Sequence, residues 1–204
     1  NTVIILTGDN GGNYDTTTAG LKGFKGFSHE GGVREPFVVK WPAKITPKSS
    51  CSEMVISTDF YPTMLEAAGL PARPDQHRDG VSFLSLLNGK NELKRDTLYW
   101  HYPHYHRTMP YGAIREKNWK LIEFYEEGDL ELYDLANDPY EKNNLATKNP
   151  KKAQELLSKF KAWKESVDAQ AMTPNPNHDP NLKKGRAKKP RKKTVSYTHL
   201  TLPT

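Results

Sequence analysis

The sequence predicts an α/β fold that continues into a small subdomain made of an antiparallel sheet and one helix. Three features of the 204-residue chain predict it: a continuous apolar run at residues 3–6, short runs rich in aromatic and β-branched residues from residue 96, and apolar residues at helical spacing after residue 149. A continuous apolar run is typical of a strand covered on both faces, whereas short runs between turns are typical of an antiparallel sheet.

The first half of the chain is expected to contain two strands and two helices. Residues 3–6 and 36–41 are the strand candidates, and their continuous apolar character favours a parallel sheet. Two strands alone do not make a stable sheet, so further strands are expected upstream. The segment 57–69 predicts a helix with Thr58 or Asp59 as N-cap and Gly69 after its end. Its apolar face would carry Phe60, Met64, Leu65 and Ala68. A second, short helix is predicted within 82–89.

The second half is expected to fold into a four-stranded antiparallel sheet covered by a helix. The strand candidates are residues 96–102, 111–117, 119–128 and 130–135, with Gly128 as a hairpin turn. Asn149 and Pro150 predict the start of the helix. The residues expected to pack on the sheet are Ala153, Leu156, Leu157, Phe160 and Val167.

Four segments are therefore predicted. Residues 1–92 would be the end of an α/β domain that is truncated at its N-terminus, and residues 93–172 the sheet-and-helix subdomain. Residues 173–194 have too little apolar surface to fold and are expected to be a disordered basic tail. The last ten residues, 195–204, resemble a translated sequencing adapter and are interpreted as an artefact.

The formal net charge of +6 is concentrated in the tail. Residues 183–193 carry eight of the 30 basic residues, which leaves 22 basic against 24 acidic residues elsewhere. The charge therefore gives no ground for assigning nucleic-acid binding to the folded part. We interpret the tail as a solvated end. The alternatives are a handle for sulfated polysaccharide or nucleic acid, which the lack of interleaved aromatic residues disfavours, and a stretch altered by a truncated reading frame.

Cysteine usage and hydropathy exclude two further features. Cys51 is the single cysteine, so the chain contains no internal disulfide. No run of about 18 apolar residues predicts a membrane span.

Two oxygen-bearing side chains, Asp9 and Asn10, directly follow the first strand, where ligands bind in open α/β sheets. A carboxylate and an amide oxygen are ligand types that calcium and magnesium prefer. Gly11 and Gly12 would let the backbone turn sharply beneath them. Calcium takes about six to eight oxygens, so residues elsewhere would have to complete the set. The alternative is a simple tight turn, because Asp, Asn and Gly are common turn residues.

Lys25 stands in the glycine-rich stretch G-F-K-G-F-S-H-E-G-G, residues 23–32. Its compact ammonium charge suits an oxygen of sulfate or phosphate, and a solvated loop lysine is the alternative. Lys22 is the weaker candidate because it lacks a glycine on each side. Glu30 and Arg34 are predicted to form an ion pair that fixes this loop.

Three histidines, His101, His104 and His106, crowd the stretch W-H-Y-P-H-Y-H. Zinc binding would require further ligands, and the sequence offers neither a matching second cluster nor a cysteine partner. Imidazole and aromatic rings together suit the rim of a sugar site. Partly buried aromatic residues at the end of a strand are the alternative.

Several motifs in this order closely resemble the C-terminal part of arylsulfatase-type sulfatases of the alkaline phosphatase superfamily. They are T-G-D-N-G-G, then G-F-K-G-F-S-H-E-G-G-V-R-E-P-F-V-V-K-W-P, then S-T-D-F-Y-P-T-M-L-E-A-A-G. The later stretches A-I-R-E-K-N-W-K-L-I and L-E-L-Y-D-L-A-N-D-P-Y-E-K-N-N-L-A resemble the C-terminal subdomain of that family. The resemblance covers residues 1 to about 170.

This resemblance implies an alkaline-phosphatase-like sulfatase fold and a role for each matching residue. Asp9 and Asn10 correspond to two ligands of an active-site calcium, with magnesium as the alternative metal. Lys25 corresponds to the lysine that contacts the sulfate group. Because the C-terminal subdomain of sulfatases borders the active-site mouth, His101 and His104 become candidates for substrate specificity.

The nucleophile of the family has no counterpart in the 204 residues. Sulfatases use a formylglycine made from Cys or Ser in a C/S-x-P-S/T-R motif, and Cys51 lies in S-C-S-E-M, which does not match. The chain is therefore expected to be a C-terminal fragment that is inactive by itself, from a parent enzyme that hydrolyses sulfate esters of carbohydrates or aryl compounds. A phosphatase, phosphodiesterase or phosphonate hydrolase of the same superfamily and a catalytically dead polyanion-binding protein are the alternatives. The resemblance also implies a sulfated small-molecule or polysaccharide substrate and a periplasmic or secreted location.

Overall fold

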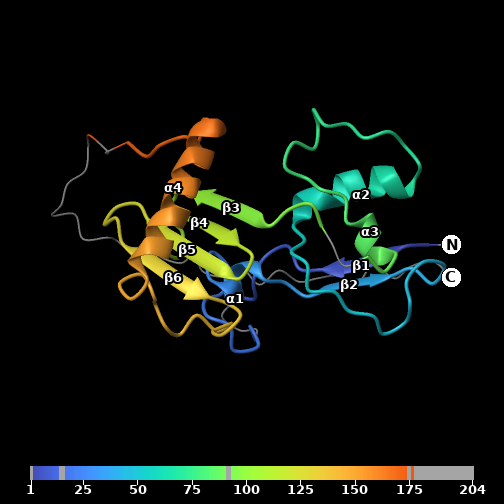
Figure 1. Ribbon diagram of the computed structural model, residues 1–204, viewed down its shortest axis with the longest axis horizontal. Coiled ribbons are helices and arrows are strands. Elements are labelled where there is room, and N and C mark those ends of the chain that lie inside the picture. The colour runs from blue at the N-terminus through green and yellow to red at the C-terminus, as the bar shows by residue number, and fades with distance from the viewer. Residues whose placement is uncertain (1, 14–16, 91–92, 174–175, 177–204) are drawn as a thin grey trace, which may run out of the picture. The chain divides into compact units, whose positions relative to one another are not determined.

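The computed structural model describes residues 2–13, 17–90, 93–173 and 176 (Figure 1). Residues 1–171 form one compact unit. The predicted boundary between residues 92 and 93 stays a prediction. The expected tail and the expected adapter-derived segment lie outside the described residues, apart from residues 173 and 176. No described helix is long and apolar enough to cross a bilayer.

The described chain contains two antiparallel sheets and four α-helices. In chain order the elements are β1 Ile4–Thr7, α1 Glu30–Val33, β2 Phe37–Lys40, a 3₁₀ turn Ser57–Asp59, α2 Phe60–Ala67, α3 Leu84–Leu87, β3 Thr97–Tyr102, β4 Tyr111–Glu116, β5 Trp119–Phe124, β6 Leu130–Asp134 and α4 Pro150–Ser166.

The second sheet has the predicted form, with four antiparallel strands in the order β3-β4-β5-β6. Its register aligns Ile114 with Leu121 and Leu121 with Leu132, so that one row of apolar side chains points to the same face. Gly128 has a φ of 71° in the turn between β5 and β6, as expected of a hairpin glycine. The short aromatic and β-branched runs therefore predicted this sheet correctly.

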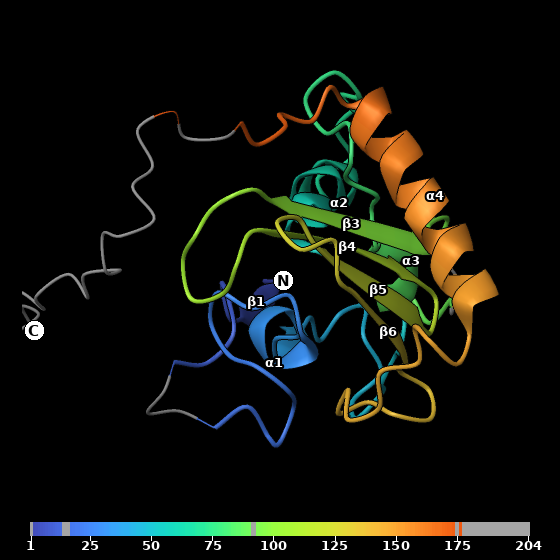
Figure 2. The ribbon, with the colours of Figure 1, turned by 90° about the vertical axis from the view of Figure 1, so that its left-hand side faces the viewer.

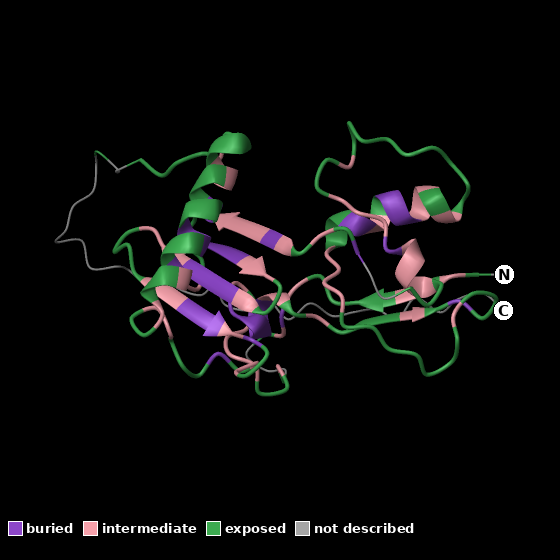
Figure 3. Cartoon of the chain, in the orientation of Figure 1, coloured by how far each residue is buried: buried purple, intermediate pink, exposed green. Residues whose placement is uncertain are grey.

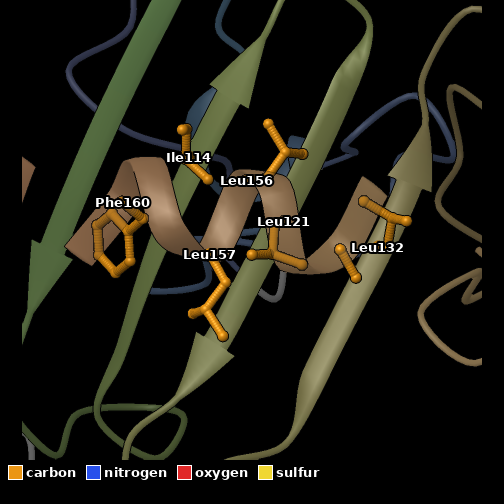
Figure 4. Close-up of a cluster of buried hydrophobic side chains, with 7 residues drawn as sticks. Ile114, Leu121, Leu132, Leu156, Leu157 and Phe160 are labelled. Carbon is orange, nitrogen blue, oxygen red and sulfur yellow. The ribbon is translucent and has the colours of Figure 1, made fainter. Parts of the chain in front are cut away.

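Helix α4 covers that apolar face, as Figure 4 shows. The side chain of Asn149 accepts a hydrogen bond from the backbone N–H of Lys152 at 3.3 Å, and Pro150 occupies the first turn. Both features confirm the predicted helix start. The residues buried in the resulting core are Ile114, Leu121, Leu132, Ala153, Leu156, Leu157 and Phe160. Val167 was expected among them but is 47% exposed, because α4 ends at Ser166.

The opposite face of the same sheet carries a second cluster and several charged residues. Side chains alternate along each strand, so Arg115 and Lys120 point away from α4. Helix α1 lies on this side, whereas α4 lies on the other (Figure 2). The buried apolar residues of this face and its margin are Tyr111, Ala113, Ile122, Tyr133 and Leu135. The sheet is thus buried on both sides, by α4 and by the segment that contains α1.

The expectation of a parallel first sheet is wrong for the described residues. Strand β1 pairs with β2 in an antiparallel register that aligns Ile5 with Val39. Most of both strands is exposed (Figure 3), with Ile4 at 56% and Leu6 at 66%. Phe37, the first residue of β2, stacks on Phe60 with ring centroids 5.9 Å apart, so the start of β2 contacts the helical segment that follows in the chain. Periodicity recognised the strands but not their direction, since direction depends on the partner.

The predicted helix in residues 57–69 is present as a 3₁₀ turn followed by α2, and Gly69 ends it with a φ of 69°. Asp59 precedes α2, but its carboxylate does not cap that helix. Instead it is fully buried and accepts hydrogen bonds from both terminal nitrogens of Arg95 at 2.6 Å. The buried residues of α2 are Pro62 and Thr63 rather than the predicted apolar face. The short second helix is confirmed as α3.

Candidate active site

The loop that follows β1 places Asp9 at the surface and Asn10 half-buried. Gly11 is buried, and its N–H donates to the carbonyl oxygen of Gly32 at 3.0 Å. A Cβ added to Gly11 would lie 2.2 Å from the carbonyl oxygen of Gly31. Gly11 is therefore required by close backbone approach, and not by the sharp turn expected from the sequence, because its φ is not in the positive range.

Lys25 lies beside this loop because its backbone N–H donates to the carbonyl oxygen of Gly12 at 2.9 Å. Its side chain is exposed, and within the described ranges its ammonium group makes no hydrogen bond or ion pair. Gly23 and Gly26 have φ of 77° and 92°, a conformation that favours glycine. The structure thus brings together the Asp9–Asn10 loop and Lys25, which the sequence singled out separately.

The donor chemistry of the Asp9–Asn10 loop fits a hard cation. A carboxylate and an amide oxygen stand side by side in sequence, and Glu35 adds negative charge nearby. Burial, followed by the charge of Asp9, raises the pKa of Glu35, which means that the two carboxylates repel each other. No group of three His, Cys, Asp or Glu side chains that could hold a metal ion occurs among the described residues. The ligand set is therefore partial in this part of the chain.

Helix α1 is attached to the sheet by an ion cluster, which consists of Glu30, Arg115, Lys120 and Glu141. The carboxylate of Glu30 lies 2.9 Å from Lys120 Nζ and 3.1 Å from an Arg115 nitrogen. Lys120 Nζ also lies 3.1 Å from Glu141 Oε1, and Glu30 N–H donates to Glu141 Oε2 at 2.7 Å. Glu30, Lys120 and Glu141 are each at most 1% exposed. Burial alone would raise the pKa of Glu30, but the charges of Lys120 and Arg115 outweigh it and lower the pKa.

The predicted Glu30–Arg34 ion pair is present but is the longest contact of that carboxylate, at 4.0 Å, and the Arg34 side chain is 58% exposed. Nothing in the sequence marks Lys120 or Glu141 as its main partners. Lys120 occupies an alternating position of a strand, where a lysine is usually solvated. Only the packing of α1 on the sheet makes the position buried.

A second polar link joins the Lys25 loop to β6. His29 Nε2 lies 2.7 Å from Glu131 Oε2, and Lys22 Nζ donates to the hydroxyl oxygen of Tyr133 at 2.7 Å. Burial would raise the pKa of Glu131, but the hydrogen bond and charge of His29, with Tyr133 and Lys22, lower it to about 2. Lys22 is therefore engaged by the sheet, whereas Lys25 is not.

The three crowded histidines have different surroundings. Both ring nitrogens of His101 are engaged, Nδ1 with the Tyr125 hydroxyl at 2.6 Å and Nε2 with the Gln170 carbonyl at 2.9 Å. His104 is exposed and meets the Tyr102 ring edge-on, with centroids 5.4 Å apart. His106 is exposed and lies against the Lys25 loop.

The contact of His106 with that loop is close. A Cβ added to Gly26 would lie 2.5 Å from His106 Nδ1 and 3.4 Å from Arg107 Cγ. Arg107 also lies over the Phe24 ring, 5.5 Å from its centroid. His106 and Arg107 were not selected from the sequence, and spacing alone does not distinguish His106 from its neighbours.

The chain is similar to known sulfatases over most of its length. The family model described as N-sulphoglucosamine sulphohydrolase, C-terminal, matches residues 23–170. A sulfatase of Formosa agariphila is 38% identical over 80% of this chain and 33% of its own length. An N-acetylglucosamine-6-O-sulfatase of Bacteroides thetaiotaomicron is 33% identical over 77% of this chain and 29% of its own length. Human arylsulfatase A is 31% identical over 71% and 33%. The chain thus spans about a third of the length of these relatives.

Solved structures agree with the family match. A sulfatase from a glycosaminoglycan-metabolism locus of Bacteroides thetaiotaomicron has a TM-score of 0.69 at 27% identity, covering 81% of this chain and 39% of that one. A protein solved with its substrate D-glucosamine-2-N,6-O-disulfate has a TM-score of 0.67 at 29% identity, covering 81% and 34%. The predicted fold, the C-terminal portion of a sulfatase α/β fold with a sheet-and-helix subdomain, is confirmed. The chain belongs to the N-sulphoglucosamine sulphohydrolase C-terminal family and corresponds to the C-terminal part of an arylsulfatase-type sulfatase.

Proposed function

We propose that the whole protein hydrolyses sulfate esters and that this chain supplies part of its metal and sulfate site. The observation that carries the proposal is the 2.9 Å hydrogen bond from Lys25 N–H to the Gly12 carbonyl, which fixes the backbone of Lys25 beside the loop that carries Asp9 and Asn10. Cation ligands and a lysine on neighbouring loops suit the negatively charged oxygens of a sulfate or phosphate ester. Family membership favours sulfate over phosphate esters and favours an enzyme over a binding protein.

The residues of this chain would act by binding and charge stabilisation. Asp9 and Asn10 would hold a calcium ion, with magnesium as the alternative, and the ion would neutralise charge on the sulfate oxygens. Lys25 would donate hydrogen bonds to a sulfate oxygen and stabilise the charge that develops as the ester bond breaks. The nucleophile, a formylglycine by resemblance, is proposed to lie in the part of the parent protein outside this chain. Within this chain, we propose a boundary between the α/β domain and the subdomain near residue 92. The proposed location of the parent protein is periplasmic or secreted.

The substrate is proposed to be a sulfated carbohydrate. By their names, two Bacteroides relatives act on N-acetylglucosamine and N-acetylgalactosamine 6-O-sulfate, and one structural neighbour is solved with a neocarrahexaose. The loop that carries His104 and His106 offers exposed imidazole and tyrosine rings beside the Lys25 loop. Such groups provide hydrogen bonds and flat apolar faces for a sugar ring.

A chimaera tests the proposal. Residues 1–171 of this chain would replace the matching part of the Bacteroides N-acetylglucosamine-6-O-sulfatase, and release of sulfate from N-acetylglucosamine 6-sulfate would be measured. We expect turnover, and we expect Lys25→Ala to lower kcat/KM by about 100-fold or more, as for loss of one oxyanion-stabilising group. Lys44→Ala, which removes another exposed loop lysine, is the matched control and should change little.

Two results would contradict the proposal. One is a folded chimaera whose turnover is the same with Lys25 and with alanine at that position. The other is release of sulfate from a sugar or an aryl sulfate by the 204-residue chain alone, because that chain lacks a nucleophile motif and is expected to be inactive. As a second measurement on that chain, inorganic sulfate should shift the amide NMR signals of Lys25 and Gly26, and Lys25→Ala should abolish the shifts.

A further inference from the structure

We propose that the ion cluster of Glu30, Arg115, Lys120 and Glu141 has a positioning role. By fixing α1 to the four-stranded sheet, it holds the backbone of Asp9, Asn10 and Lys25 in place. The catalytic meaning of this positioning rests on the proposed function. The mechanical link itself rests on contacts among the described residues, and it can be tested without turnover.

The cluster is poorly explained as a source of stability alone. Glu30, Lys120 and Glu141 are buried, so all three charges have lost their hydration. Apolar residues of similar volume commonly give equal or greater stability than such buried ions. What the ions provide is direction, because each charge-assisted hydrogen bond specifies where Glu30 points. Glu141 also has a φ of 52°, a conformation rarely adopted by residues with a side chain, which indicates that its placement is held against backbone strain.

Helix α1 depends on this external support. It has four residues, which is too short to be stable as an isolated helix. At its first residue, the Glu30 N–H donates to Glu141 and the Glu30 carboxylate meets Lys120 and Arg115. The orientation of α1 is therefore set by strands β4 and β5 and by Glu141, which lies in the loop between β6 and α4.

From α1 the contacts continue to the candidate site. Gly31 N–H donates to the Lys22 carbonyl at 2.8 Å, and the Gly32 carbonyl accepts from Gly11 N–H at 3.0 Å. A Cβ on Gly31 would lie 2.4 Å from the Gly23 carbonyl oxygen, so these backbones are in direct contact. Gly11 and Gly12 immediately follow Asp9 and Asn10, and Gly12 accepts from Lys25 N–H. A displacement of α1 would thus move both the oxygen ligands and Lys25.

The test uses the 204-residue chain and amide hydrogen exchange measured by NMR. The triple variant Glu30→Gln, Lys120→Met, Glu141→Gln removes the three buried charges while nearly preserving volume. We expect its Tm to stay within a few degrees of wild type, and exchange at the Gly11 and Lys25 amides to become at least about tenfold faster. The amides of β4 and β5 residues whose side chains face α4 should keep their protection from exchange. A merely structural role would not produce this local change at equal Tm.

The matched control removes a different ion pair between elements. Glu123→Gln with Lys164→Met breaks the 3.1 Å contact between β5 and α4 on the opposite face of the sheet. Exchange at Gly11 and Lys25 should not change in this variant. Should the triple variant fail to fold, the single variant Glu141→Gln tests the inference, because it keeps the Glu30–Lys120 pair. Hydrogen exchange at the Gly11 and Lys25 amides should still become several-fold faster in it.

Unchanged exchange at Gly11 and Lys25 in a folded variant without the cluster would overturn the inference. Equal acceleration in the Glu123–Lys164 control would overturn it as well, because the effect would then be a general loosening. Neither result depends on sulfate release, so failure of the positioning role and failure of the sulfatase proposal are separate observations.

Discussion

Among single residues, the histidines illustrate how availability differs within one motif. Both nitrogens of His101 are engaged by Tyr125 and Gln170, so it has no free nitrogen for a ligand. His104 and His106 are exposed, and only His106 lies against Gly26, next to Lys25. The proposed substrate rim is therefore centred on His106, with His104 beside it. His101, proposed from the sequence, has the surroundings of a residue that fixes the loop.

This arrangement predicts selective effects in the chimaera. His106→Ala should lower kcat/KM for N-acetylglucosamine 6-sulfate by about tenfold, the value of roughly one lost hydrogen bond, and leave 4-nitrophenyl sulfate nearly unaffected. His104→Ala should act in the same direction more weakly. His101→Ala should lower Tm without favouring either substrate. Parallel assays on both esters check this, and equal losses on both for His106→Ala would count against the rim.

At the level of elements, α4 and the second sheet depend on local patterns that agree with their tertiary contacts. The helical spacing of Leu156 and Phe160 coincides with full burial of both side chains. Val167 has the same spacing but lies beyond the helix end and is exposed. Strand β1 is different, because the side that its apolar residues cover depends on which chain segment pairs with it. Its continuous apolar character predicted a strand correctly and its parallel pairing wrongly.

The contrast within α4 gives a stability prediction. Leu156→Ala should lower the free energy of unfolding by about 2–5 kcal/mol, because it leaves a cavity in the core under α4. Val167→Ala should change it by no more than about 0.5 kcal/mol, since that side chain is 47% exposed. Urea denaturation of both variants measures the difference. Similar losses for the two would show that α4 does not pack as described.

For the molecule as a whole, two polar links fasten the Lys25 loop and α1 to the sheet face opposite α4. One is the Glu30 cluster, and the other joins His29 and Lys22 to Glu131 and Tyr133. Buried ionic links make global stability depend on pH, because protonation of a carboxylate removes its interactions. Glu131 is the carboxylate to examine, because its pKa is lowered from 4.5 to about 2.

The pH dependence has a definite sign. The pKa of Glu131 is about 2 in the folded chain, below its ordinary value of 4.5, so the unfolded chain binds more protons between these values. Stability from this group is complete above about pH 4.5 and is lost as pH falls towards about 2, by at most about 3 kcal/mol. Urea unfolding of wild type and Glu131→Gln from pH 6 to pH 2 measures it. The variant should lose less stability over this window, and parallel curves would refute the assignment.

Local backbone preferences were determined by the sequence alone. The four strands of the second sheet, the start of α4 at Asn149, the turn glycines Gly69 and Gly128, and the ordered sulfatase motifs all follow from residue types at short spacing. These features depend on interactions between residues that are close along the chain, which periodicity and turn chemistry report directly. For the same reason Lys25 and Asp9 could be selected as candidate site residues before the backbone contact between Lys25 and Gly12 was known.

The tertiary structure alone decided which distant groups meet. Glu30 is separated from Lys120 by 90 positions and from Glu141 by 111, and no local pattern couples them. The antiparallel pairing of β1, the burial of Lys120 and the contact of His106 with Gly26 are of the same kind. Each depends on how separate segments pack, and packing brings residues together according to shape and charge rather than according to their spacing in sequence.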